Sequence, residues 1–274
     1  MLEIFREAAR VIESGRRAAL ATIVSTSGST PGKECAKLLV RDDGTTVGTV
    51  GGGCTENEVW KMAMEVITTE IPARTKFRLT AATAAETGLL CGGEFEVFIE
   101  PIGNPNVAIF GAGHCAQSLT RILEPLDYRM VVFDDRETYA NAERFPEGTE
   151  TVVGPFESCA DQVDLSANTF VVIVTRGHDH DETVLEQVVR SEAPYVGVIG
   201  SRGKIGAIFK NLRKRGVTDE QLARVRAPIG LDIGSRSPDE VAISIAAELI
   251  AFRRGRAPEP RSPMKRPSAV TPPT

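Results

Sequence analysis

Hydrophobic positions in the first hundred residues change their spacing several times, which predicts a mixture of helices and strands. Leu2, Phe5, Ala9 and Ile12 recur at helical spacing, so an amphipathic helix should open the chain. Apolar or alternating segments predict strands over residues 18–24, 37–41, 45–50, 74–80 and 94–100. Asp42-Asp43-Gly44, between the second and third of these, is a hairpin signal. The first part of the chain should therefore be a mixed α+β domain.

The pattern changes after residue 106 to apolar runs that alternate with helical segments. The apolar runs cover residues 107–110, 130–134, 170–175 and 195–200, and the helical segments cover residues 114–123, 183–190 and 204–215. Such alternation predicts a doubly wound parallel sheet, that is, a Rossmann-like domain. A last helix should begin at Ser237, because Ser-Pro-Asp-Glu combines an N-cap residue, a first-turn proline and a capping glutamate.

The change of pattern also places the domain boundary, in a segment that contains Gly103, Asn104 and Pro105. We therefore expect an N-terminal α+β domain with glycine- and cysteine-containing loops over residues 1–102. A Rossmann-like domain should follow over residues 103–255. The proline-rich residues 256–274 should form a disordered tail.

Composition and charge narrow the class of protein. The 274 residues carry a net charge of −5, which argues against a nucleic-acid partner because such partners usually require a basic face. Five cysteines cannot all pair, and they resemble the reduced thiols of a cytoplasmic protein. The acidic N-terminus lacks a long apolar run, so we expect neither a signal peptide nor membrane insertion.

Two glycine-rich segments with cysteines are candidate binding loops. Gly51, Gly52 and Gly53 precede Cys54, and Thr55 with Glu58 forms a T-x-x-E pattern that predicts a helix beginning at Thr55. Near such a helix start an anion can bind and a thiol tends to ionise. Cys91-Gly92-Gly93 is the second candidate. The alternative is that both loops need small residues only for packing, with cysteine serving as a small hydrophobe.

A third glycine-rich segment has the spacing of a dinucleotide-binding turn. Gly111-x-Gly113-x-x-Ala116 lies between a predicted strand and a predicted helix, which is the context that this motif requires. Asp134, at the end of the next strand, is placed to accept a hydrogen bond from a ribose hydroxyl, and Arg136 could meet a phosphate. The same turn also serves as a plain strand–helix joint, so bound NAD does not follow from it.

Two more polar loops follow predicted strands. His178 and His180, in a His-Asp-His-Asp run, could bind a metal or could simply begin a helix with capping groups. Ser201 and Arg202, with Lys204 beside them, could bind an anion or form a solvated helix start. The residues leave both choices open.

Taken together, these motifs resemble the XdhC/CoxI family of xanthine dehydrogenase accessory proteins. The N-terminal motifs that carry the resemblance are residues 28–31, 50–56 and 91–93, and the C-terminal ones are residues 110–114, 134–136, 143–146, 175–181, 199–202, 228–234 and 238–249. Two cysteines depart from the expected pattern. Cys115 should be a packing residue, whereas Cys35 could add a thiol to the site or be incidental.

The resemblance implies a two-domain protein, often a homodimer, that binds molybdenum cofactor as molybdopterin or its dinucleotide form. A cysteine desulfurase would supply the terminal sulfido ligand, and the cofactor would then pass to a molybdenum hydroxylase apoenzyme. Cys54 and Cys91 are the candidate molybdenum contacts, since thiolates suit a soft metal. The candidate cofactor-binding residues are Gly51, Gly52, Gly53, Cys54, Glu56, Cys91, Gly92, Gly111, Gly113, His114, Asp134, Arg136, Ser201 and Arg202.

Two rival functions remain at this point. The Rossmann-like domain could bind NAD(P) in an oxidoreductase, although no acid/base partner for hydride transfer is evident. The chain could also be a docking protein for the hydroxylase, with loops that bind nothing. We expect an accessory protein with no catalytic residues of its own.

Overall fold

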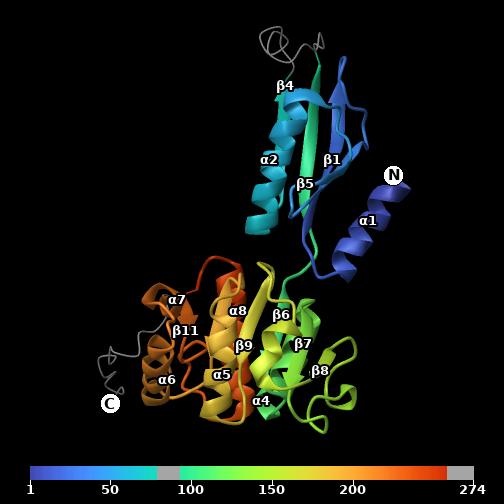
Figure 1. Ribbon diagram of the computed structural model, residues 1–274. Coiled ribbons are helices and arrows are strands. Elements are labelled where there is room, and N and C mark those ends of the chain that lie inside the picture. Colours follow the sequence, from blue (N-terminus) through green and yellow to red (C-terminus); the bar gives the residue numbers. More distant parts are fainter. Residues whose placement is uncertain (79–92, 258–274) are drawn as a thin grey trace, which may run out of the picture. The chain divides into compact units, whose positions relative to one another are not determined.

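The computed structural model describes residues 1–78 and 93–257, and it divides into two compact units (Figure 1). Unit 1 comprises Met1–Asn104 and unit 2 comprises Pro105–Thr274. The division therefore falls within the segment that the change of sequence pattern indicated. Most of the expected proline-rich tail lies outside the described residues, as do Cys91 and Gly92.

In its described residues, 1–78 and 93–104, unit 1 is an antiparallel sheet with one helix on each face. Its elements are α1 (Leu2–Glu13), β1 (Ala18–Ser27), β2 (Lys37–Arg41), β3 (Thr46–Gly48), α2 (Gly53–Thr69), β4 (Ala73–Arg78) and β5 (Glu94–Ile102). The strand order is β3-β2-β1-β5-β4, and β2 and β3 form the predicted hairpin. All pairings in this sheet are antiparallel.

Alternation along the strands explains why both faces of this sheet are covered. Ala19, Ala21 and Ile23 of β1 point into a core shared with α2, whereas Ala18 and Leu20 point into a second core shared with α1. Figure 1 shows the two helices on opposite sides of the sheet. The period-two pattern of a strand buried on both faces thus fixes the three layers.

Unit 2 is a parallel sheet with helices on both faces. Its strands are β6 (Asn106–Phe110), β7 (Arg129–Asp134), β8 (Glu150–Val153), β9 (Thr169–Ile173), β10 (Tyr195–Val198) and β11 (Val225–Arg226). Its helices are α4 (His114–Leu123), α5 (His178–Val188), α6 (Arg202–Lys214), α7 (Asp219–Ala223) and α8 (Pro238–Arg253). Three short 3-10 turns cover Glu124–Leu126, Ala142–Arg144 and Phe156–Asp161.

The strand order of unit 2 is that of a dinucleotide-binding domain. The order β11-β10-β9-β6-β7-β8 reads 6-5-4-1-2-3 when the strands are numbered within the unit, and every pairing is parallel. Successive strands are added to one side of β6 up to β8 and to its other side from β9 onward, so the switch point lies between β6 and β9. Ligands bind outside the carboxyl ends of the strands at such a point. The predicted Rossmann-like architecture is confirmed.

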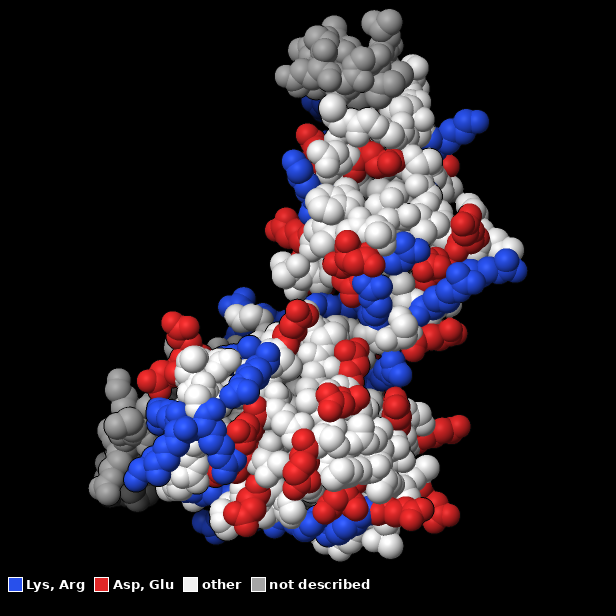
Figure 2. Space-filling model, in the orientation of Figure 1, with Lys and Arg blue, Asp and Glu red and all other residues white. Residues whose placement is uncertain are grey.

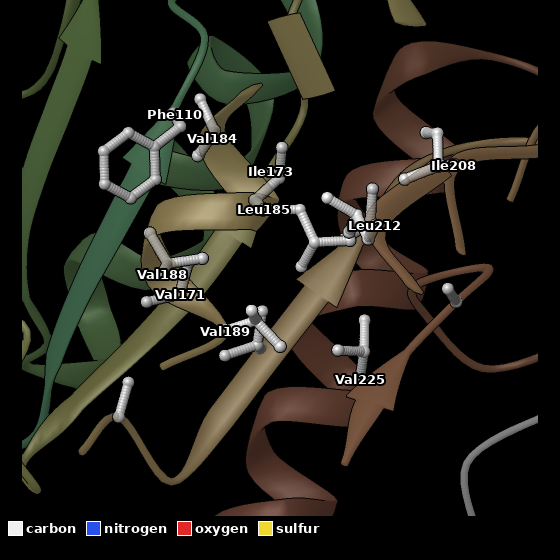
Figure 3. Close-up of a cluster of buried hydrophobic side chains, with 14 of the residues drawn as sticks. Phe110, Val171, Ile173, Val184, Leu185, Val188, Val189, Ile208, Leu212 and Val225 are labelled. Carbon is white, nitrogen blue, oxygen red and sulfur yellow. The ribbon is translucent and has the colours of Figure 1, made fainter. Parts of the chain in front are cut away.

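Two apolar cores hold the helices of unit 2 against the sheet. On one face, Phe110, Val171 and Ile173 of the sheet pack against Leu185 of α5 and Leu212 of α6 (Figure 3). On the other face, α4 and α8 cover a separate cluster.

The last helix begins as predicted and is fixed by polar contacts near its end. The Ser237 side chain accepts a hydrogen bond from the Glu240 amide at 3.2 Å, and the Glu240 carboxylate accepts one from the Ser237 amide at 3.1 Å. The buried Glu248 carboxylate accepts from the Tyr195 hydroxyl and from the Gly230 amide, both at 2.7 Å. These bonds attach α8 to β10 and to the loop that precedes the helix.

Candidate functional sites

A crevice of about 390 Å³ lies at the switch point of the unit 2 sheet. Its lining includes Gly113 and His114 after β6, Arg136 after β7, Arg176 after β9 and Arg236 before α8. Gly113, His114 and Arg136 are candidates from the sequence. Arg176 and Arg236 are not among the residues that the sequence predicts, although Arg176 follows a predicted strand directly.

The glycine-rich turn of unit 2 has the geometry that its sequence motif indicates. Gly111 has a φ of +106°, and a Cβ at this position would lie 2.5 Å from the carbonyl oxygen of Val174. Only glycine allows β6 to turn this closely against the end of β9. Gly113 is the N-cap of α4, and a Cβ there would meet no atom within 4 Å. The turn is therefore closed toward the sheet and open toward the crevice.

Asp134 is engaged within the protein and does not face a ligand. Its side chain is only 1% exposed and accepts a hydrogen bond from the Ala112 amide at 2.8 Å. The Arg136 guanidinium donates to both carboxylate oxygens, at 2.8 and 3.0 Å, and the Arg136 amide donates at 3.1 Å. Protein donors thus occupy the acceptor positions of Asp134, whose carboxylate we expected to accept from a ribose hydroxyl. Its carboxylate instead tethers the glycine-rich turn.

Three arginines, Arg136, Arg144 and Arg176, lie close to Asp134 and its neighbours. The Arg136 guanidinium lies over the Tyr139 ring at 3.6 Å from its centroid, and Arg144 lies over the same ring at 4.7 Å. Arg176 pairs with both oxygens of Asp135, the neighbour of Asp134. This pairing lowers the pKa of Asp135 to about 2, so the carboxylate stays ionised at neutral pH.

Arg236 differs from the other two arginines of the crevice. Within residues 1–78 and 93–257, no acidic side chain pairs with its exposed guanidinium. Its backbone amide donates to Glu240 at 2.6 Å, which fixes the position of the residue before α8. The crevice therefore carries one guanidinium that no carboxylate of the described chain compensates.

The His-Asp-His-Asp run forms the start of α5. Asp181 is fully buried, and its carboxylate accepts from the Thr175 hydroxyl at 2.6 Å and amide at 3.1 Å and pairs with Lys204. His178 contacts Asp179 at the surface, and the His180 ring packs on Phe156 with centroids 5.0 Å apart. No group of three or more His, Cys, Asp or Glu side chains arranged for a metal occurs in the described part of the chain. No side chain caps α5, whose N-cap is Gly177, and Asp181 instead supplies a hydrogen-bond network with Thr175 and Lys204.

Ser201 and Arg202 open α6. The Ser201 hydroxyl is the N-cap and accepts from the Lys204 amide at 3.4 Å, while Arg202 is the first helical residue. From the loop after β10, Ile199 lines the crevice. A structural role as a helix start thus accounts for Ser201.

In unit 1, three loops that carry candidate motifs pack backbone against backbone. A Cβ on Gly32 would lie 2.3 Å from the Val50 carbonyl oxygen, and one on Gly51 would lie 2.8 Å from the Gly32 nitrogen. A Cβ on Gly93 would lie 2.5 Å from the Ser29 carbonyl oxygen. Residues 28–32 therefore lie between the Val50–Gly53 loop and the segment that follows Cys91 and Gly92.

Glu56, rather than Thr55 and Glu58, organises the start of α2. The helix begins at Gly53 with Gly52 as its N-cap, and no side chain caps it. The predicted capping box is therefore wrong. Gly51, Gly52 and Gly53 all have positive φ, and Glu56 Oε2 accepts from the Thr49 hydroxyl at 2.5 Å and from the Val50 and Gly52 amides at 3.1 Å. These bonds give Glu56 a structural role that the sequence does not predict.

The cysteines differ in exposure. Cys54, the second residue of α2, is exposed, as is Cys35, whose φ is +67°. Burial, with a smaller contribution from Asp239, raises the pKa of Cys115 in the crevice to about 11, and burial raises the pKa of Cys159 to about 12. Cys115 and Cys159 are therefore protonated at neutral pH, whereas Cys54 presents its sulfur at the surface beside the glycine loop.

Acidic and basic side chains alternate over much of the face seen in Figure 2, and Lys and Arg gather over α6. Ion pairs offset part of that charge, since Arg215 contacts Glu182 and Glu186 and Arg213 contacts Asp219. Among the described residues, no helix is both long and apolar enough to cross a lipid bilayer.

Comparisons with known proteins give two family matches. The model of the XdhC and CoxI family matches residues 11–78, and the model of the XdhC Rossmann domain matches residues 107–249. A solved structure described as a xanthine dehydrogenase from Bacillus halodurans has a TM-score of 0.51 and 21% identity, over 92% of this chain and 96% of that chain. This likeness supports the fold.

Three curated proteins are similar over large parts of the chain. The uncharacterized protein YqeB of Escherichia coli is 33% identical over 92% of this chain and 46% of its own length. A protein of Bacillus subtilis, described as a probable subunit of xanthine dehydrogenase, is 24% identical over 57% of this chain and 44% of its length. The molybdenum cofactor insertion chaperone PaoD of Escherichia coli is 21% identical over 91% of this chain and 88% of its length.

The chain thus spans less than half the length of the first two relatives and most of the length of the third. The family matches lie on both units, and the second alone covers more than half of the chain. The chain belongs to the XdhC and CoxI family.

Proposed function

We propose that this protein binds molybdenum cofactor and serves in the maturation of a xanthine dehydrogenase-type molybdenum hydroxylase. In this role it holds and protects the cofactor while a cysteine desulfurase supplies the sulfido ligand. It then delivers the cofactor to the hydroxylase apoenzyme. The cofactor is cargo here, so the protein needs binding and release but no turnover of its own. A homodimer is part of the same proposal.

Family membership together with the exposed Cys54 carries the proposal. A relative named as a molybdenum cofactor insertion chaperone aligns with 91% of this chain, so both units take part in that likeness. Cys54 lies at the first turn of α2, beside a glycine loop that is braced by residues 28–32. An exposed thiol suits a soft metal, so the donor chemistry fits the cofactor.

Different residues of unit 1 would have different roles in binding molybdenum cofactor. Cys54 would contact the molybdenum end, and Gly51, Gly52 and Gly53 would let the backbone approach the ligand closely. Glu56 would hold the loop in shape, through its bonds to Thr49, Val50 and Gly52. Cys91 and Gly92 remain predicted contacts that lie outside the described residues.

The test is anaerobic equilibrium binding of molybdenum cofactor to the full chain. We expect near-stoichiometric retention of pterin and molybdenum by the wild type. Cys54→Ser should weaken retention by about tenfold or more, because it removes a soft ligand. Cys35→Ser removes another exposed thiol of unit 1 and decides between the two roles open for Cys35: retention equal to the wild type makes Cys35 incidental, and weaker retention adds it to the site. Absence of retention by the wild type would contradict the proposal.

The alternative, an NAD(P)-dependent oxidoreductase, has one observation in its favour. The crevice of unit 2 lies at the switch point where such cofactors bind. The engagement of Asp134 by Arg136 and Ala112 weighs against recognition of an NAD ribose. Oxidation of NADH coupled to reduction of a substrate would favour this alternative over the cofactor chaperone.

A further inference from the structure

The crevice of unit 2 differs from an NAD site at the carboxylates that would accept hydrogen bonds from a ribose. Asp134 is the last residue of β7 and Asp135 follows it, and each carboxylate pairs with an arginine guanidinium. Asp134 is held by Arg136 and by the Ala112 amide, and Asp135 is held by Arg176. A ribose diol needs a free carboxylate acceptor at this position. The buried Asp134 carboxylate already accepts four hydrogen bonds from protein donors, and Asp135 is held in an ion pair with Arg176.

The same crevice presents cations from three separate loops. Arg136, Arg176 and Arg236 all line it, and two of the three pair with Asp134 and Asp135. Arg236 has no acidic partner in the described part of the chain, so its guanidinium can serve an external anion. Guanidinium donors match phosphate geometry, often with two parallel hydrogen bonds.

The remaining lining is suited to a ring rather than to a bare ion. Val174, Ile199 and Val241 contribute apolar side chains beside the arginines. Apolar side chains provide a surface on which a flat ring can pack beside the arginines. The volume of about 390 Å³ is near the lower end of the range of about 300–1,000 Å³ for ligand pockets. It therefore accommodates one ring with its phosphate, and the rest of a dinucleotide would extend beyond the crevice.

We propose that this crevice is a phosphate-selective site for an organic phosphate that carries a flat ring, with Arg236 as the principal anion contact. Selectivity comes from phosphate groups and not from a ribose diol. A free nucleotide and the phosphorylated end of a pterin cofactor share this chemistry. The site rests on the geometry of unit 2 alone, so it does not depend on Cys54 or on the proposed maturation role.

Calorimetric titration of the full chain tests the site with adenosine, ADP, NAD⁺ and NADP⁺. ADP and NADP⁺ should bind saturably, adenosine should not, and NADP⁺ should bind at least as tightly as NAD⁺. Arg236→Ala should weaken ADP binding by about tenfold or more, because a charge-assisted contact is lost. Arg121→Ala is the matched control, since Arg121 lies in the last turn of α4 and outside the crevice.

A second variant tests the reason for the selectivity. Arg136→Ala removes the guanidinium that occupies Asp134, so binding of NAD⁺ relative to NADP⁺ should rise by about tenfold. A merely structural role of Arg136 would weaken both ligands equally, and that result would contradict the proposed selectivity. Thermal unfolding of each variant shows whether it is folded.

The two sources of phosphate are separated by measuring retention of molybdenum cofactor by Arg236→Ala. Weaker retention without binding of free nucleotides assigns the site to the cofactor, and binding of nucleotides assigns it to them. Wild-type binding of NAD⁺ more than tenfold tighter than NADP⁺ would overturn the proposal. So would the absence of any Arg236-dependent binding of ADP, NADP⁺ or molybdenum cofactor. A loss of cofactor retention in Cys54→Ser alone bears only on the maturation role.

Discussion

Glu56 lies in the first turn of α2 and holds the glycine loop that precedes this helix. Its carboxylate accepts from the Thr49 hydroxyl and from the amides of Val50 and of the N-cap residue Gly52, so it fixes the chain just before the helix. An incoming anion would have to share this loop with a fixed negative charge. The proposed metal contact is therefore Cys54 rather than the amides that Glu56 occupies.

Replacing Glu56 should show how much this carboxylate stabilises unit 1. Glu56→Ala should lower the free energy of unfolding by about 1–2 kcal/mol, because bonds to a partly exposed charged acceptor are lost. Denaturant-induced unfolding followed by circular dichroism measures the difference. Glu58→Ala, an exposed position two residues further along α2, should change stability by less than about 0.5 kcal/mol. Equal effects of the two substitutions would contradict the assigned role of Glu56.

At the residue scale, the sequence predicts where the motif residues lie in the fold, but it does not predict which groups they contact. Gly111 and Gly113 are found where the motif places them, because the spacing of a strand–helix turn is local. Asp134 and Arg136 are also at the expected place, but they pair with each other. That pairing depends on side-chain conformations and on the Ala112 amide, neither of which a sequence pattern contains.

At the scale of elements, helix starts with local sequence signals are predicted well, whereas short strands are missed. The start of α8 follows from Ser237 and Glu240, which lie three residues apart and form a capping box. The strands β8 and β11 are missed because the first is partly exposed and the second has two residues. The T-x-x-E pattern at Thr55 fails because the helix begins two residues earlier, at Gly53, which places Thr55 inside the first turn.

Asp181 connects three elements and provides the test at this scale. It links the end of β9, through Thr175, and the first turn of α6, through Lys204, to the start of α5. Asp181→Ala should lower the free energy of unfolding by about 2–3 kcal/mol, less than for a wholly buried pair because Lys204 is partly exposed. Asp179→Ala is the control, because the Asp179 side chain is 87% exposed and should change stability little. Similar melting temperatures for both variants would rule out a linking role for Asp181.

At the scale of the whole molecule, the four hydrophobic clusters divide cleanly between the units. Two consist only of residues from unit 1 and two only of residues from unit 2. The predicted boundary, before residue 103, lies two residues from this division, because a long alternating strand–helix pattern begins immediately after a Gly-Asn-Pro segment. The packing of the three unit 1 loops was not accessible from the sequence, since it joins residues far apart along the chain.

Unit 2 should therefore fold without unit 1. A fragment of residues 105–257 contains both of its cores and the full parallel sheet, so we expect helical circular dichroism and one cooperative thermal transition. A fragment of residues 105–236 is the control. It lacks α8 and with it Glu248, the partner of Tyr195 and Gly230, and it exposes the apolar face that α8 and α4 share. This shorter fragment should fail to unfold cooperatively. If the longer fragment also lacks a transition, unit 2 depends on unit 1 for its stability, and the phosphate site must then be studied only in the full chain.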